Sequence, residues 1–187
     1  RRSPSKNCCK NAKRCCAPCL PIVVSRKGRV EFAFDNDAFE PCRVEYTLGL
    51  TALDGQMLWS KSGMVEARAN RLTPLATCDL AADKRRPGDH YFLRVKGFPT
   101  VRCFADGWRK VPWPEADPSF AEVRPGVVRV SAKDRYVRMA HLALRNPAGE
   151  ADFSDNYFDL GTGESREVSV TAHAGELKLL NWGTAWE

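Results

Sequence analysis

Cysteine is the residue type capable of chemistry that this sequence concentrates most strongly. Five of the eight cysteines lie within twelve positions near the N-terminus, and two of them, Cys16 and Cys19, form a C-x-x-C pair. A structural zinc site needs two such pairs, or four Cys and His ligands at suitable separation. The segment holds no histidine, its other pairs are vicinal (Cys8–Cys9 and Cys15–Cys16), and Pro18 interrupts the C-x-x-C pair. We therefore predict reduced thiols and no metal site.

Histidine and carboxylate side chains are present but form no recognisable catalytic set. His90, His141 and His173 are each isolated from Ser, Cys or Asp motifs. The acidic stretch Asp152–Asp159 offers oxygen ligands, but it lacks the alternating spacing and the distal Glu of an EF-hand loop. The sequence also contains no Gly-rich phosphate loop, no G-x-S-x-G and no H-E-x-x-H motif. We therefore predict no catalytic residue, no metal and no cofactor.

Tryptophan is the remaining residue type that suggests a binding function. Exposed aromatic rings can stack on sugar rings, and Trp108 and Trp113, which flank Arg109 and Lys110, are the best candidates for such a patch. The alternative is packing in the core or between domains, because large aromatic side chains supply much of the core of a small sandwich. Both uses stay open, with Trp108 and Trp113 as the candidate carbohydrate-binding residues.

The positive charge of the chain is confined to its N-terminal end. The net charge is +6, yet the first 30 residues hold nine Lys and Arg side chains and no acid, whereas the other 157 hold 20 basic and 23 acidic side chains. A nucleic-acid-binding protein carries its basic patch on a folded face with aromatic side chains among the cations. Residues 1–30 contain no Phe, Tyr, Trp or His, so we predict no binding to nucleic acid.

The elements that must position these side chains are β-strands. Apolar residues alternate with polar or small ones at a period of two, which is typical of half-buried antiparallel strands. Turn sequences rich in Gly and Pro separate these stretches, and helical periodicity is almost absent. The pattern predicts an all-β fold of antiparallel sandwiches. The clearest alternating stretches are residues 30–34, 44–50, 91–95, 128–130, 168–170 and 177–179.

A proline-rich stretch near the middle of the chain predicts a boundary between two domains. Lys110–Pro118 packs three prolines into nine residues, which suits an extended connector. A length of 187 residues fits one domain or two small ones. We predict a basic, Cys-rich arm over residues 1–20, a first sandwich over 21–108, the connector over 109–118 and a second sandwich over 119–187.

The sequence gives no sign of a membrane or targeting segment. No apolar run approaches the roughly 18 residues of a membrane-spanning helix, and residues 1–19 lack the apolar region of a signal peptide. We therefore expect no membrane partner. The chain begins with Arg1 instead of Met, so we expect it to be part of a longer protein.

One motif in the C-terminal half points to a known family. Phe153–Leu160 reads F-S-D-N-Y-F-D-L, and it resembles a segment of the C-terminal immunoglobulin-like domain of β-mannosidases of glycoside hydrolase family 2. Gly28–Pro41 resembles the strand and turn that open the preceding sandwich of those enzymes, and Leu53–Gly55 resembles that sandwich's first hairpin. Lys13–Pro18 resembles the segment where the family's catalytic barrel ends. The resemblance therefore extends over most of the chain.

The resemblance implies both a fold and a role. It implies two consecutive immunoglobulin-like sandwiches after a short remnant of the barrel, and a parent enzyme that hydrolyses terminal non-reducing β-mannose residues. The two catalytic glutamates of that retaining mechanism lie in the barrel, so the chain should be inactive alone and should have the barrel as its partner. β-Mannoside glycans are a further candidate ligand. The compartment stays open, with a periplasmic, secreted or lysosomal parent as the candidates, depending on the organism. A carbohydrate-binding module and an independent adhesion or interaction domain remain as alternatives.

Within the motif, the resemblance assigns structural roles to Asp155, Asn156, Tyr157, Phe158 and Asp159. Side chains alternate between the two faces of a strand. We expect the motif to be one strand, so that either Tyr157 or Phe158 enters the core and the other faces a neighbouring domain or the barrel.

We expect the N-terminal arm to be poorly anchored. Residues 1–19 carry six positive charges and no acid, and their apolar side chains are limited to Ala and Cys, so they have little to pack with. Their five thiols should then be open to oxidation. Cys15 and Cys16 also depart from the family, which often has aromatic residues at these positions.

Overall fold

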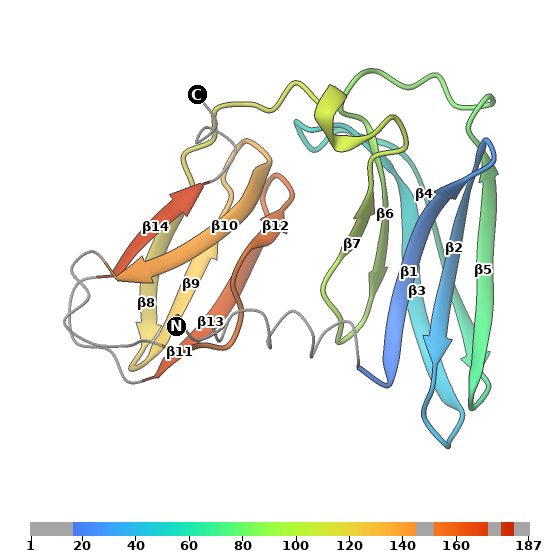
Figure 1. The fold of residues 1–187 in the computed structure, drawn as a ribbon, viewed down its shortest axis with the longest axis horizontal. Coiled ribbons are helices and arrows are strands. Elements are labelled where there is room, and N and C mark those ends of the chain that lie inside the picture. Colours follow the sequence, from blue (N-terminus) through green and yellow to red (C-terminus); the bar gives the residue numbers. More distant parts are fainter. Residues whose placement is uncertain (1–16, 145–151, 172–176, 182–187) are drawn as a thin grey trace, which may run out of the picture. The chain divides into compact units, whose positions relative to one another are not determined.

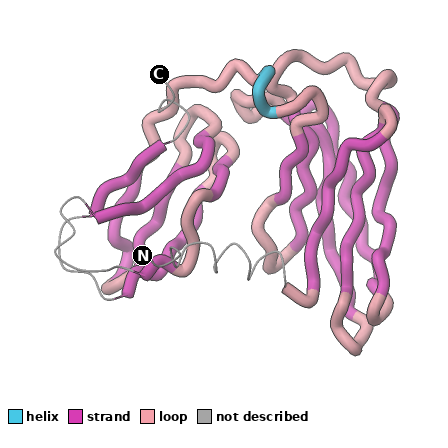
Figure 2. The backbone as a smooth tube through the Cα atoms, viewed as in Figure 1, coloured by secondary structure: helices cyan, strands magenta, loops and turns pink. Residues whose placement is uncertain are grey.

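The computed structural model describes residues 17–144, 152–171 and 177–181. Within these ranges antiparallel strands make up nearly all of the regular structure (Figure 1), and the one helical element is the 3₁₀ turn η1 (Trp108–Lys110), which stands out from the strands in Figure 2. The chain separates into two compact units. The N-terminal unit is built mainly from residues up to Pro112, and the C-terminal unit mainly from Trp113 onward.

The N-terminal unit is a sandwich of two antiparallel sheets. Its strands are β1 (Cys19–Arg26), β2 (Arg29–Asn36), β3 (Cys42–Thr51), β4 (Met57–Ala67), β5 (Arg71–Asp79), β6 (His90–Val95) and β7 (Val101–Cys103). One sheet has the order β1-β2-β5, and the other has the order β4-β3-β6-β7. The alternation predicted from the sequence sorts the side chains, because Val30 and Phe32 are buried while Glu31 between them is exposed. Together with Leu48 and Tyr91 of the second sheet they belong to one apolar core.

The C-terminal unit repeats this architecture with shorter strands. They are β8 (Ser119–Arg124), β9 (Val127–Ser131), β10 (Val137–Leu144), β11 (Asp152–Phe153), β12 (Phe158–Leu160), β13 (Ser165–Thr171) and β14 (Leu177–Asn181). One sheet has the order β11-β13-β9-β8, and the other has the order β12-β10-β14. Val128 of β9 pairs with Val168 of β13, and both pack in a core with Leu142 of the facing sheet. The predicted all-β class with immunoglobulin-like sandwiches is confirmed.

Some of the sequence predictions concern residues outside the described ranges. Residues 1–16 of the predicted arm are among them, as is His173. The first strand begins at Cys19, which places this cysteine in a sheet and not in a loose arm. No helix within the described residues is long and apolar enough to cross a membrane.

Candidate functional site

The family motif at residues 153–160 is not one strand, contrary to our prediction. Strand β11, which ends at Phe153, pairs with β13, whereas β12, which begins at Phe158, pairs with β10 of the other sheet. The intervening Ser154–Tyr157 has no strand pairing, and Tyr157 has a φ of 56°, a region that residues other than Gly rarely adopt. The motif therefore carries the chain from one sheet of the sandwich to the other.

Asn156 takes the place that the backbone would occupy if β12 continued. Ala140 pairs with Phe158 in the β10–β12 ladder, so antiparallel register would place residue 156 opposite Leu142. The Asn156 side chain accepts a hydrogen bond from Leu142 N at 2.8 Å and donates one to Leu142 O at 2.9 Å. A side-chain amide presents a donor and an acceptor together, as a peptide group does. Asn156 thus extends the ladder where the backbone has turned away.

The carboxylates of the motif also join neighbouring segments. Asp159 accepts hydrogen bonds from the Tyr136 hydroxyl at 2.7 Å and from Met139 N at 2.8 Å, and Met139 lies at an irregularity in the pairing of β10. Asp155 accepts a hydrogen bond from Arg166 Nη1 at 2.8 Å in a half-buried ion pair. Both carboxylates therefore accept hydrogen bonds from groups of their own unit.

The two aromatic residues of the motif enter different environments. Phe158 is buried in the core of the C-terminal unit, and the Arg166 guanidinium lies 4.7 Å from the centre of its ring. Tyr157 is half-buried and stacks on the imidazole of His141, with ring centres 4.3 Å apart. Phe158 is therefore the core residue of the pair, while Tyr157 packs on β10.

The two tryptophans predicted to bind carbohydrate belong to different units, and their surroundings differ. Trp113 is half-buried in the C-terminal unit, where its ring lies 5.6 Å from that of Tyr136 and the Arg138 guanidinium lies over it at 4.8 Å. Trp108 lies in η1 of the N-terminal unit and is 52% exposed. Trp113 thus packs within its unit, whereas Trp108 is more exposed and has the Arg109 guanidinium 5.4 Å from its ring centre.

A hollow of about 240 Å³ lies in the N-terminal unit, and its lining includes Gly107, which precedes Trp108 in the sequence. It is lined by two segments of the chain, Arg85 and residues 87–89 from the first, and Phe104, Asp106, Gly107, Lys110 and Val111 from the second. We call it the η1 hollow. Its charged lining consists of Arg85, Asp89, Asp106 and Lys110, and Phe104 contributes an aromatic ring.

Two of the charged groups in the η1 hollow are held in place by neighbours. Arg85 is only 13% exposed, and its Nη1 donates a hydrogen bond to Asp106 Oδ2 at 2.7 Å. The Asp89 side chain is only 3% exposed, and its Oδ2 accepts a hydrogen bond from Arg86 N at 2.8 Å. The hollow therefore has cationic and anionic groups fixed on the same surface.

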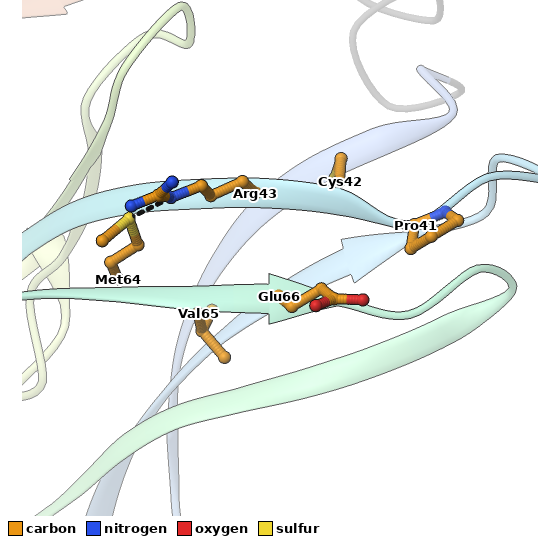
Figure 3. A pocket seen from close by; sticks show the side chains of 6 residues that line it. All are labelled: Pro41, Cys42, Arg43, Met64, Val65 and Glu66. Carbon is orange, nitrogen blue, oxygen red and sulfur yellow. Dashed lines mark hydrogen bonds between the residues drawn. The ribbon is translucent and has the colours of Figure 1, made fainter.

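A second, more open hollow of about 390 Å³ lies at the ends of β3 and β4 (Figure 3). Arg43 and Met64 lie side by side on these neighbouring strands, and Arg43 Nε donates a hydrogen bond to the Met64 sulfur. Arg43, Met64 and Glu66 are all exposed. This hollow lacks the converging, partly enclosed polar groups of a ligand site, so we assign it no chemistry.

The four cysteines of the described residues are free thiols that pack against the core of the N-terminal unit. Burial raises the pKa of Cys19, Cys78 and Cys103, so these three thiols keep their protons at neutral pH. Cys19 Sγ also donates a hydrogen bond to Asn36 Oδ1 at 3.3 Å. Within the described part of the chain, no three His, Cys, Asp or Glu side chains are arranged to hold a metal ion.

Two groupings in the N-terminal unit were not predicted from the sequence. Asn36 is fully buried and donates hydrogen bonds to Glu40 O and Ala67 O. The sequence signal for this grouping is that a polar residue ends an alternating apolar stretch. The η1 hollow had no such signal, because Arg85 and Asp106 come from separate loops. Only the three-dimensional fold brings these two side chains together.

Comparison with family models finds a match in the second half of the chain. Residues 123–182 match the Ig_mannosidase model, which describes an Ig-fold domain. The matched segment contains the motif that crosses between the two sheets. A comparison with curated protein sequences gave no match.

Comparison with solved structures extends the likeness to nearly the whole chain. A β-D-mannosidase from Dictyoglomus thermophilum matches 95% of it at 17% identity, with a TM-score of 0.77. An exo-chitosanase from Amycolatopsis orientalis matches 94% at 14% identity, with a TM-score of 0.51. The chain spans 23% and 27% of the lengths of these two proteins. At such low identity the likeness shows that they share its fold.

Proposed function

We propose, from the premise that residues 123–182 are an Ig-fold domain of the mannosidase family, that this chain is the non-catalytic β-sandwich region of a β-mannosidase-like exo-glycosidase. The family match is the observation that carries the proposal, because the matched residues include the crossing at Asn156. The fold also recurs within a much longer β-D-mannosidase chain, of which this chain covers 23%. The parent enzyme would hydrolyse terminal non-reducing β-mannose residues.

The local role that we assign is to support a catalytic barrel of the same parent protein. Hydrolysis with retention needs two carboxyl groups about 5 Å apart across the scissile bond. The motif carboxylates Asp155 and Asp159 instead accept hydrogen bonds from groups of their own unit. Large apolar side chains are exposed on the N-terminal unit, including Phe39 at 91%, Leu72 at 56% and Met64 at 51%. Such surface is suited to contact with a further domain.

An activity assay tests the non-catalytic part of the proposal. The purified 187-residue chain is incubated with an aryl β-mannoside, and release of the aryl alcohol is followed by absorbance. We expect the rate to equal that of buffer alone. Turnover that co-purifies with the chain through a second, unrelated purification step would contradict the proposal.

The coding sequence that precedes Arg1 tests the assignment to a parent glycosidase. We expect it to encode a (β/α)₈ barrel with two glutamates at the carboxyl ends of its strands, where such barrels place their catalytic groups. A preceding sequence that encodes no barrel would contradict the supporting role and would favour an independent interaction domain.

A further inference from the structure

We propose that the η1 hollow binds one hexopyranose unit of a neutral glycan, and that the glycan also contacts the exposed Trp108, which follows Gly107 of the lining. The ligand class follows from the size, the charge balance and the aromatic groups of the hollow. The inference does not rest on the supporting role proposed above, because a module can bind a glycan whether or not it also packs on a barrel. Either proposal can therefore fail without the other.

The size of the hollow suits one sugar ring. Sites for drug-sized ligands usually enclose about 300–1,000 Å³, and the η1 hollow has about 240 Å³. Its walls are also shaped by backbone contacts within each loop, because Asp89 N donates a hydrogen bond to Arg86 O at 3.0 Å and Gly107 N donates one to Phe104 O at 2.9 Å. The loops are thus preformed for a small ligand.

The charges that line the hollow favour a neutral ligand with many hydroxyl groups. An anion would meet the carboxylates of Asp89 and Asp106, and a cation would meet Arg85 and Lys110, so neither is favoured. A sugar hydroxyl both donates and accepts hydrogen bonds, so neighbouring hydroxyls can use both kinds of group. Hydrogen bonds to charged partners are stronger than those between neutral groups.

The aromatic side chains supply the apolar part of the interaction. Phe104 lines the hollow, and its ring packs against the buried ring of His90, with the two ring centres 4.7 Å apart. Trp108 follows Gly107 of the lining and is 52% exposed. The face of an aromatic ring carries partial negative charge, which attracts the C–H groups on one face of a pyranose.

The test is an NMR titration of the ¹⁵N-labelled 187-residue chain with methyl β-D-mannopyranoside, with the glucopyranoside and sodium phosphate as parallel probes. We expect saturable shifts of amides in residues 85–89 and 104–111 with at least one sugar. For a single sugar unit the Kd should be on the order of 1 mM.

Substitutions of exposed side chains test where the sugar binds, and we expect them to leave the fold intact. Lys110→Ala should raise the Kd at least about tenfold, since it removes a group that lines a small site, and Trp108→Ala should do the same if the glycan contacts this ring as proposed. Phe39→Ala and Lys96→Ala are the matched controls, because Phe39 is 91% exposed and the Lys96 side chain 85% exposed, and neither lines the hollow. The control variants should bind as the original chain does.

Three results would overturn the proposal. The first is the absence of saturable shifts with either sugar. The second is sugar binding that survives in both Trp108→Ala and Lys110→Ala. The third is saturation of the same amides by phosphate at lower concentration than by sugar, which would make the hollow an anion site.

Discussion

Replacing Asn156 by Ala tests whether its side chain acts as part of the β10–β12 ladder. The substitution removes the acceptor for Leu142 N and the donor for Leu142 O, both of which lie within 3 Å of the amide. Leu142 is fully buried and Asn156 is only 7% exposed, so little water reaches the two backbone groups. The variant therefore leaves one donor and one acceptor of the strand without a partner.

The expected loss of stability follows from these two groups. A buried polar group left without a hydrogen bond costs about 1–3 kcal/mol, so the pair costs about 2–6 kcal/mol in free energy of unfolding. Small domains have only about 5–15 kcal/mol in total. We therefore expect a large decrease in the urea midpoint of the C-terminal unit. The NMR signals of the buried valines in this unit report its unfolding.

Hydrogen exchange gives a local measure of the same interaction. The Leu142 amide should exchange much faster in Asn156→Ala, whereas the amide of Leu48 in the N-terminal unit should keep its protection. Ser169→Ala is the control, because this side chain is exposed on β13 and its loss should change stability by less than about 0.5 kcal/mol. If Asn156→Ala unfolds like this control and the Leu142 amide stays protected, the ladder interpretation is wrong.

The remaining predictions concern the other motif residues and the thiols. Phe158→Ala should cost about 3–5 kcal/mol, because it empties a core position; Tyr157→Ala should cost clearly less, because its ring stacks on half-buried His141, and equal urea midpoints for the two variants would contradict this difference. Cys78 and Cys103 should react with Ellman's reagent at pH 8 much more slowly than free cysteine, because burial raises their pKa. Only the thiolate reacts, so the labelling rates of these two thiols should keep rising above pH 9. Mass spectrometry of the two cysteine peptides measures each rate separately. Rapid labelling of either cysteine at pH 8 would contradict the prediction.

The strands of the chain could be predicted because burial on one face leaves a trace in the sequence. In β2 the alternation of Val30, Glu31 and Phe32 is the alternation of core and solvent. The same reasoning found β9 and β13, where paired valines fill the core. A pattern of this kind depends only on residues that are neighbours in the chain.

The sheet crossing at the motif could not be found in that way. A period of two says which residues share a face, but it does not say which strand lies alongside, and Ser154–Tyr157 keeps the mixed polar and apolar composition of an edge strand. The η1 hollow could not be predicted for a related reason, because the hydrogen bond between Arg85 and Asp106 joins residues 21 positions apart in the sequence. Contacts between distant segments depend on the register of the whole fold.

The chemistry of the crossing explains why an amide is needed at position 156. Aspartate in its place would keep the acceptor for Leu142 N but would set a charged oxygen against Leu142 O. That repulsion and the burial would raise the pKa of the new carboxyl above its unfolded value of about 3.9. Below the folded pKa the protonated carboxyl can donate to Leu142 O, so Asn156→Asp should regain stability as the pH falls from 7 to 4.5.

The original chain has no such group at this position, and its own pH dependence provides the baseline. Urea midpoints at the two pH values measure the difference directly. A variant whose midpoint changes with pH no more than that of the original chain would show that position 156 does not need a donor. The hydrogen bonds to Leu142 would then not explain why the motif has asparagine at this position.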